Sequence, residues 1–175
     1  MRPLGSFGVL IAAIVLAACH DAGPTDVPSA DRPRSSVTRL NGVSLVNTSS
    51  AERLRPASLG IALIGPEGGS IEVDGARFTV PPGALSQPVW ISMYGKLNDQ
   101  YRFRFGPNGL RFAVPATLTI AVQPRAIGIE TARLAVAMAS DFQDDWRVIG
   151  GSYDPATESV SVAVHHFTQY ALCQN

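Results

Sequence analysis

The chain has 175 residues, of which 46% are hydrophobic and 16% are charged. Fourteen Lys and Arg residues balance fourteen Asp and Glu residues, so the formal net charge is zero. No cluster of basic residues rises above this balance, and we therefore expect no nucleic-acid partner.

The N-terminus has the pattern of an export signal. Arg2 is the only charged residue before a run from Leu4 to Ala18 that consists mostly of Val, Ile, Leu and Ala. This run is shorter than the roughly 20 apolar residues that a membrane-spanning helix needs, and it fits the apolar region of a signal peptide. We predict a signal peptide over residues 1–18.

The end of the signal and the residue after it form the tetrapeptide Leu16–Cys19, Leu-Ala-Ala-Cys. It resembles the bacterial lipobox, in which the cysteine is lipidated and the signal is then cleaved in front of it. The resemblance implies that lipid on Cys19 attaches the exported protein to a membrane. His20 follows where an aspartate would favour the inner membrane in enterobacteria, which implies the outer membrane, facing the periplasm or the cell surface. The alternative is an ordinary secretory signal with an incidental Cys19.

Cys173 is the second of the two cysteines. If lipid occupies Cys19, Cys173 has no partner and is expected to be a free thiol. The alternative is a disulfide between Cys19 and Cys173, formed in an oxidising compartment.

Residues 19–58 are rich in Pro, Ser, Thr, Asp and Arg and contain few aromatic residues. Such a segment buries too little apolar surface to offset the entropy lost on ordering the chain. We therefore predict a lipidated N-terminus followed by a flexible tether that ends at residue 58. Within it, only the weakly apolar stretch 43–46 suits a strand.

The domain predicted at 59–175 alternates apolar and polar residues almost throughout, which is typical of strands. Asp74-Gly75 separates two such runs and indicates a hairpin, because a type I′ turn needs positive φ at both central residues. Many short strands with Gly and Pro turns predict an all-β domain, either a sandwich or a barrel. In chain order, the expected strands are 71–73, 78–80, 89–94, 101–105, 117–122, 133–138, 146–149 and 160–164.

Two of these strands carry further information. Residues 101–105 alternate aromatic residues with arginine, so three rings are expected on one face and two cations on the other. In 133–138, the alanines would also suit a helix, but the alternation of Leu134, Val136 and Met138 favours a strand.

Three segments in this order resemble the ZU-five domain, a β-sandwich of ankyrins, netrin receptors and zonula occludens proteins. Residues 68–70 and 78–85 are similar to the family's Gly-Gly opening and its Pro-Pro-Gly-Ala-Leu corner. Residues 105–118 are similar to its Gly-Pro stretch, and residues 166–170 to its closing His-Phe-[Ser/Thr] strand. The resemblance covers most of 66–172. It implies an antiparallel β-sandwich that serves as a binding or structural module and not as an enzyme.

The sharpest chemical hypothesis concerns His166-Phe167-Thr168. In a death-domain protein of this family, and in an unrelated nucleoporin, a similar His-Phe-Ser cuts its own backbone. Carried over, Thr168 would be the nucleophile, Phe167 would supply the scissile carbonyl and His166 would be the base of a single-turnover N-to-O acyl shift. Residues 166 and 168 share one side of a regular strand, as this role requires.

The favoured alternative is that His166 is a structural residue, hydrogen bonded inside the sandwich. Alternate residues would then form one inward face of the last strand or strand pair: Val160, Val162, Val164, His166, Thr168, Tyr170 and Leu172. Cleavage would also release only a very short C-terminal peptide.

Other polar groups are weaker candidates for a site. Asp141, Asp144 and Asp145 supply the oxygen ligands that calcium favours, but their spacing does not match an EF-hand loop. His165 and His166 are expected on opposite faces of a strand and therefore do not predict a zinc pair. We predict no metal and no cofactor. Besides the membrane, we expect an envelope protein or a glycan as partner.

Overall fold

The computed structural model describes residues 36–49, 52, 54–123 and 128–175. The predicted signal peptide and Cys19 lie outside this part of the chain. Within the described ranges, no helix is both long enough and apolar enough to cross a membrane.

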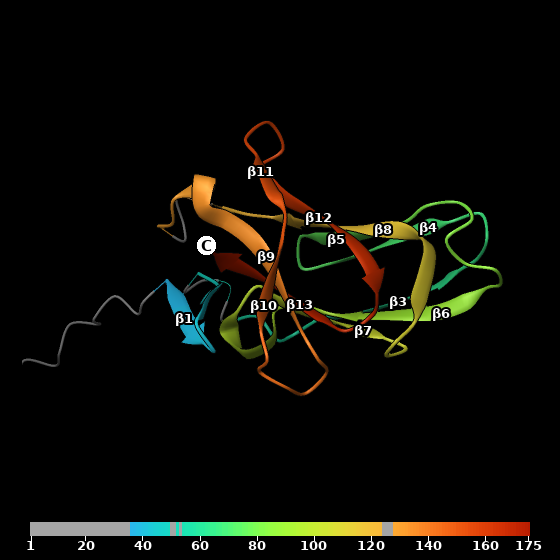
Figure 1. The fold of residues 1–175 in the computed structure, drawn as a ribbon, viewed down its shortest axis with the longest axis horizontal. Coiled ribbons are helices and arrows are strands. Elements are labelled where there is room, and N and C mark those ends of the chain that lie inside the picture. The colour runs from blue at the N-terminus through green and yellow to red at the C-terminus, as the bar shows by residue number, and fades with distance from the viewer. Residues whose placement is uncertain (1–35, 50–51, 53, 124–127) are drawn as a thin grey trace, which may run out of the picture. The chain divides into compact units, whose positions relative to one another are not determined.

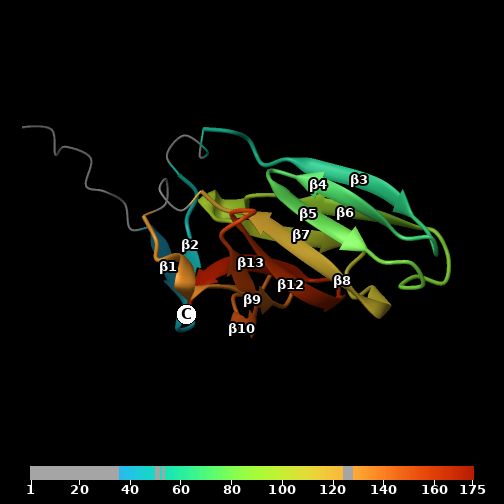
Figure 2. The same ribbon diagram turned by 90° about the horizontal axis from the view of Figure 1, so that it is seen from above.

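The described residues form two antiparallel sheets, which lie as two layers in Figures 1 and 2. The fold is therefore all-β, and the predicted antiparallel sandwich is confirmed. The first sheet contains β1 (Val37–Leu40), β2 (Val43–Val46), β3 (Leu59–Ile64), β6 (Val89–Tyr94), β7 (Arg102–Gly106), β9 (Leu134–Ala139), β10 (Arg147–Gly150) and β13 (Gln169–Gln174). The second contains β4 (Gly69–Val73), β5 (Ala76–Val80), β8 (Arg111–Ala121), β11 (Ser152–Asp154) and β12 (Ser159–His166). Two short 3₁₀ turns, Leu97–Asp99 and Thr131–Arg133, connect strands.

The first sheet forks at β13. One side of β13 pairs with β9 along its whole length. The other side is shared, because residues 169–171 pair with β7 while Cys173 and Gln174 pair with β2. The C-terminal strand therefore joins the N-terminal hairpin β1–β2 to the rest of the sheet, and the C-terminus lies close to β1 in both views (Figures 1 and 2).

The folded unit begins before residue 59, where the sequence placed the end of the tether. Strands β1 and β2 lie within 19–58, and Leu45 and Val46 of β2 are fully buried. Asn41 and Gly42 connect the two strands with φ of 46° and 82°, the positive values that a type I′ hairpin requires. The Asn-Gly pair in the sequence indicates a hairpin, so the prediction of a flexible tether up to residue 58 was wrong for this segment.

Most predicted strands are confirmed, and several have nearly the predicted bounds. Strand β6 occupies 89–94, and Asp74 and Gly75 turn between β4 and β5 with φ of 50° and 76°. Residues 134–139 form strand β9 and no helix. Every residue of β9 is buried, because its two faces pack against different clusters.

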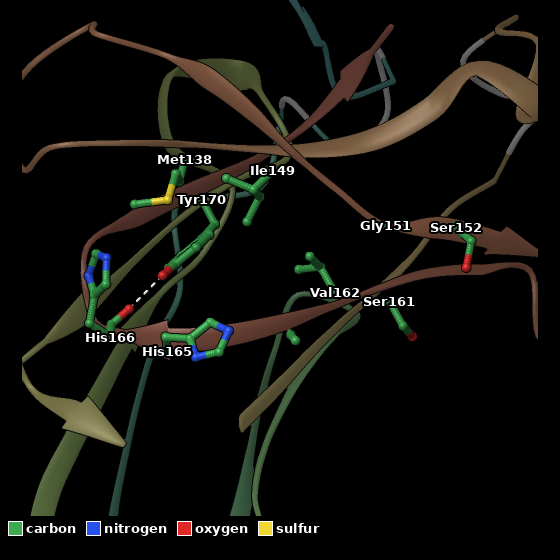
Figure 3. Close-up of a pocket in the computed structure, with 10 residues that line it drawn as sticks. Met138, Ile149, Gly151, Ser152, Ser161, Val162, His165, His166 and Tyr170 are labelled. Atoms are coloured by element: carbon green, nitrogen blue, oxygen red, sulfur yellow. Dashed lines mark hydrogen bonds between the residues drawn. The ribbon is translucent and has the colours of Figure 1, made fainter. Parts of the chain in front are cut away.

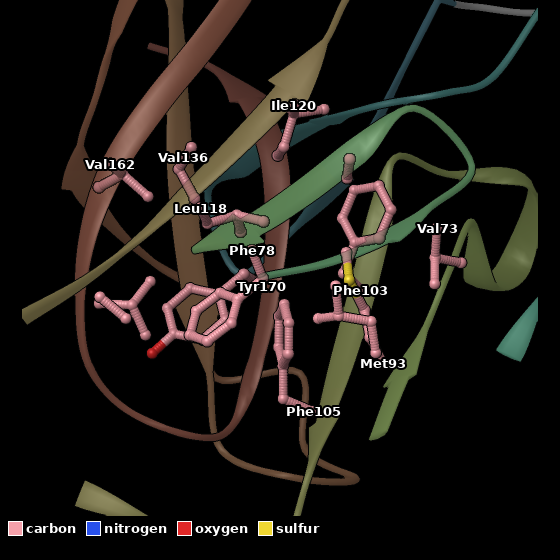
Figure 4. Packing of buried hydrophobic residues seen from close by; sticks show 14 of the residues in the cluster. Val73, Phe78, Met93, Phe103, Phe105, Leu118, Ile120, Val136, Val162 and Tyr170 are labelled. Atoms are coloured by element: carbon pink, nitrogen blue, oxygen red, sulfur yellow. The ribbon is translucent and has the colours of Figure 1, made fainter. Parts of the chain in front are cut away.

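The main core lies between the two sheets and contains a group of packed aromatic rings (Figure 4). Phe78 is fully buried, with its ring centroid 4.8 Å from that of Phe105 and 5.2 Å from that of Phe167. Phe105 and Phe167 stack at 5.1 Å. Tyr101, Phe103 and Phe105 all face inward, which confirms the predicted aromatic face of residues 101–105.

A smaller cluster covers the opposite face of β9 and β13. It contains Leu45, Ala135, Ala137, Ala139, Trp146, Ala171 and Cys173. The small alanine side chains leave room for the Trp146 ring over the sheet, and this explains why β9 alternates large residues with alanine. Cys173 is a free and fully buried thiol, and burial raises its pKa to about 11.

The Gly-Gly opening and the Pro-Pro-Gly corner form one structural unit. Gly68 has φ of +79°, and a Cβ at this position would lie 2.5 Å from the Val80 carbonyl oxygen and 2.9 Å from the Pro82 nitrogen. The Gly83 N–H donates to the Pro66 carbonyl at 2.8 Å. The two motifs therefore occur together because the backbone of one packs directly against the backbone of the other.

Candidate functional site

The His-Phe-Thr motif is the point where the chain crosses from one layer to the other. His166 ends β12 of the second sheet, and β13 of the first sheet begins at Gln169. Phe167 inserts its ring into the aromatic core, and its N–H donates to the Leu110 carbonyl at 2.7 Å. Because the strand ends here, the alternation of a regular strand does not relate His166 to Thr168.

The groups around the Phe167–Thr168 bond are well defined. The Phe167 carbonyl oxygen accepts from the Gly109 N–H at 3.2 Å and lies 3.4 Å from His166 Nδ1. The Thr168 hydroxyl donates to the Ala139 carbonyl of β9 at 2.5 Å. The structure thus brings His166 to the carbonyl oxygen of the bond, while the hydroxyl of Thr168 is directed to β9.

A hollow of about 560 Å³ lies beside this corner, lined by residues of β9, β10, β11, β12 and β13 (Figure 3). Met138, Ile149 and Val162 line it with apolar groups. Tyr170 also lines it, and its hydroxyl donates to the His166 carbonyl at 2.5 Å. Polar groups therefore line the hollow near the His-Phe-Thr motif, and Ser152 and Ser161 line it farther from the motif (Figure 3).

His165 and His166 both line this hollow, although the sequence predicted that they face opposite ways. The pairing of β12 with β8 shifts here, from Val164 opposite Ala116 to His166 opposite Arg111. Such an irregularity breaks the alternation of side chains along a strand. Across the described part of the chain, no three His, Cys, Asp or Glu residues gather closely enough to hold a metal ion.

The three aspartates of the predicted acidic loop each make different interactions. Asp145 accepts from the Ser140 N–H at 2.8 Å and from its hydroxyl at 2.7 Å, and these bonds lower the pKa of the Asp145 carboxyl. Asp144 lies 3.6 Å from the Arg102 guanidinium. Burial raises the pKa of Asp141. The three carboxylates therefore do not converge on a common point.

Glu52 forms an ionic cluster that ties the segment before β3 to the sandwich. It accepts hydrogen bonds from Lys96 Nζ, from the Tyr101 hydroxyl at 2.9 Å and from the Ser49 hydroxyl at 2.9 Å. Burial by itself would raise the pKa of the Glu52 carboxyl, but these donors outweigh it and lower the pKa to about 2. Sequence reasoning missed this cluster, although Ser49 and Glu52 have the spacing of a helix capping box.

This cluster predicts a loss of stability in acid. In the unfolded chain Glu52 takes up a proton near its ordinary pKa of 4.5, whereas in the folded chain it does so at about 2. The stabilisation is complete above pH 4.5 and is lost as the pH falls to about 2. Because the carboxylate is partly open to water, we expect a contribution of about 1 kcal/mol to the free energy of unfolding.

Urea unfolding at a series of pH values measures this contribution. We expect Glu52→Gln to flatten the pH dependence between pH 4.5 and 2, whereas Leu54→Ala, in the same segment, leaves it unchanged. An equally steep dependence in Glu52→Gln would show that other carboxylates are responsible.

The outer face of β3 and β6 exposes large apolar side chains. Leu59, Ile61 and Leu63 of β3 are 51%, 60% and 54% exposed. Trp90 of β6, opposite Leu63, is 66% exposed. We call these four residues the β3–β6 face.

The sequence of β3 did not reveal this face. Large residues at 59, 61 and 63 alternate with Gly60 and Ala62, a pattern that normally places the large residues inside. Here the small residues point inward, because a Cβ on Gly60 would lie only 2.6 Å from Val73 Cγ2 of β4. Close packing of β4 against β3 therefore turns the large side chains outward.

The described residues thus offer three features that bear on function: the hollow at His165 and His166, the Glu52 cluster and the β3–β6 face. Among the described residues that line the hollow, the Ser161 hydroxyl bonds to Thr119 and not to His165 or His166. No protein-family model matches the chain, and a search of curated proteins finds no match.

Proposed function

We propose that this chain is a lipid-anchored protein of the bacterial cell envelope whose β-sandwich is a binding or structural module and not an enzyme. The lipid on Cys19 would hold the protein to a membrane, in the outer membrane rather than the inner one. The partner of the sandwich would be an envelope protein or a glycan. The likeness of the three motifs to the ZU-five domain supports an interaction module, by analogy of fold.

The main support for a binding role is the exposed apolar β3–β6 face. Single exposed apolar side chains are common on soluble proteins, whereas contiguous apolar patches mark surfaces that contact other molecules. This face gathers three aliphatic side chains and one Trp, each at least half exposed. Tryptophan is also among the residues enriched where partners bind.

Metabolic labelling with an alkyne fatty acid tests the anchor. We expect label on the wild-type protein and on Cys173→Ser, the matched cysteine control, and none on Cys19→Ser. Labelled protein should sediment with the outer membrane. Label that persists in Cys19→Ser would contradict lipidation of that residue.

Photo-crosslinking in cells tests the binding face. A photoreactive residue at position 90 should form an adduct with an envelope component, and the same residue at position 114, exposed on β8, should not. Mass spectrometry identifies the captured molecule. Equal adducts from both positions, or none from position 90, would argue against a role of this face in binding.

A second candidate function is cleavage of the Phe167–Thr168 bond. The contacts from the Gly109 N–H and His166 Nδ1 to the Phe167 carbonyl oxygen support it, because donors at this oxygen stabilise the charge of an acyl transfer. In this reaction the Thr168 hydroxyl attacks the Phe167 carbonyl carbon, the C–N bond breaks, and water hydrolyses the resulting ester. The hydrogen bond of that hydroxyl to Ala139 makes this candidate the second choice.

Intact mass of the denatured protein distinguishes the two candidates. We expect one species that retains residues 168–175. A product that ends at Phe167 in the wild type, and that is absent in Thr168→Ala, would instead establish self-cleavage.

A further inference from the structure

The edges of the two sheets differ in how well they are protected against pairing with another strand. In the described part of the chain, five strands pair on one side only: β1, β3, β4, β10 and β11. Natural edge strands avoid association by being short or by carrying charged residues. Strand β11 has three residues and ends in Asp154, and β1 and β10 have four residues each and contain Arg39 and Arg147. Strand β4 carries Glu72, paired with Arg77 at 2.7 Å.

Strand β3 has none of these protections. It is six residues long and contains neither a charged residue nor a proline. The Gly95 N–H donates to the Ser58 carbonyl at 2.9 Å, which sets the alternation of hydrogen bonds along the β3–β6 pair. In an antiparallel pair with this alternation, the N–H and C=O groups of Leu59, Ile61 and Leu63 point to the side away from β6.

We propose that β3 pairs antiparallel with β3 of a second copy of this chain, across a two-fold axis at Ile61, to form a homodimer with a continuous sheet. An antiparallel pair of identical strands satisfies the self-complementarity that a two-fold interface requires. In this register Ile61 lies opposite its own copy, and Leu59 of each chain lies opposite Leu63 of the other. The three residues with outward backbone groups exchange hydrogen bonds, and their apolar side chains form cross-strand pairs.

Charges at the two ends of β3 favour a second copy of the chain as the partner and favour the antiparallel orientation. Arg55 precedes the strand and Glu67 follows it, and both side chains are exposed. The Glu67 carboxylate lies against Gly65, where a Cβ would be 2.5 Å from Glu67 Oε2. Both residues lie in turns just outside β3, so antiparallel pairing about Ile61 places the end that carries Arg55 in each copy beside the end that carries Glu67 in the other. Opposite charges therefore come together at both ends of the paired strands, which favours self-association in this orientation.

Analytical ultracentrifugation over a range of concentrations tests the dimer. The protein is the chain from residue 19 with Cys19→Ser, so the result does not depend on lipidation or on the proposed anchor. We expect a reversible dimer for this protein and for Val114→Lys, the control on β8. We expect a monomer for Ile61→Lys, which places two like charges opposite each other at the axis.

A charge swap tests the register with substitutions at exposed positions. Arg55→Glu should weaken the dimer roughly tenfold, because it opposes like charges at both ends. Adding Glu67→Arg to the same chain should restore the affinity. Circular dichroism of every variant establishes that the fold is retained.

Three results would overturn the proposal: a monomer at all concentrations, a dimer unaffected by Ile61→Lys, or an Arg55→Glu defect that Glu67→Arg does not rescue. Trp90 fluorescence in the presence of phosphatidylcholine and phosphatidylglycerol vesicles tests the alternative that a lipid surface, and not a second copy, contacts β3. A monomer whose Trp90 emission shifts to the blue on these vesicles would assign the edge and face to a lipid surface instead.

Discussion

Replacing Phe78 by alanine is expected to lower the free energy of unfolding by about 3–5 kcal/mol. The Phe78 side chain is fully buried, and its ring lies within 5.7 Å of the centroids of Phe105, Phe112 and Phe167. Both sheets contribute to this group, so the mutation removes apolar contacts between the layers and leaves a cavity where they meet. Urea unfolding, followed by tryptophan fluorescence, measures the change.

Phe142→Ala is the matched control. It removes the same side chain from a position that is 78% exposed, where the ring centroid lies 4.8 Å from the Arg104 guanidinium, so it should change the free energy of unfolding by no more than about 1 kcal/mol. If Phe78→Ala were no more destabilising than Phe142→Ala, the aromatic group could not be the centre of the core. Such a result would also question the packing of the two layers.

The second large effect is expected at Gly68. A side chain there meets two obstacles: φ of +79°, and the Val80 carbonyl oxygen 2.5 Å from the added Cβ. The left-handed conformation costs about 1–2 kcal/mol and the overlap with backbone adds about 1–3 kcal/mol. We expect Gly68→Ala to lower the free energy of unfolding by about 3 kcal/mol.

Gly109→Ala separates the two contributions. Gly109 has a similar φ of +76°, but a Cβ there would have no neighbour within 4 Å. We therefore expect this variant to show only the conformational cost, about 1–2 kcal/mol. Equal losses in the two variants would mean that the Gly-Gly opening is not held against the Pro-Pro-Gly corner.

The structure also gives the His-Phe-Thr motif a role that does not depend on catalysis. Phe167 supplies a ring to the core, Thr168 bonds to β9, and the Tyr170 hydroxyl bonds to the His166 carbonyl. Together these contacts hold the crossover from β12 to β13, where the chain leaves one layer for the other. The architecture therefore explains the side chains of Phe167 and Thr168, whereas His166 contributes its backbone carbonyl, which any residue would supply.

Local patterns in the sequence were sufficient for most strands and for the class of fold. Asp74-Gly75 determined a hairpin because few other residue pairs accept its two positive φ angles. In residues 101–105, the aromatic side chains alternate with arginines, so the apolar side chains all lie on one face of the strand and that face is buried. In both cases the information lies within a few neighbouring residues.

Tertiary structure decided what depends on distant partners. Strand β2 is the stretch 43–46 that the sequence marked as suited to a strand, but it joins the sheet through β13, more than a hundred residues later, so the composition of 19–58 did not reveal that it belongs to the folded unit. His165 and His166 share one hollow because the pairing of β12 with β8 shifts beside them. The face of β3 that points outward was fixed by Val73 and Ile71 of β4, which leave no space beside Gly60. Alternation defines two faces of a strand, but only the neighbour packed against it determines which face is buried.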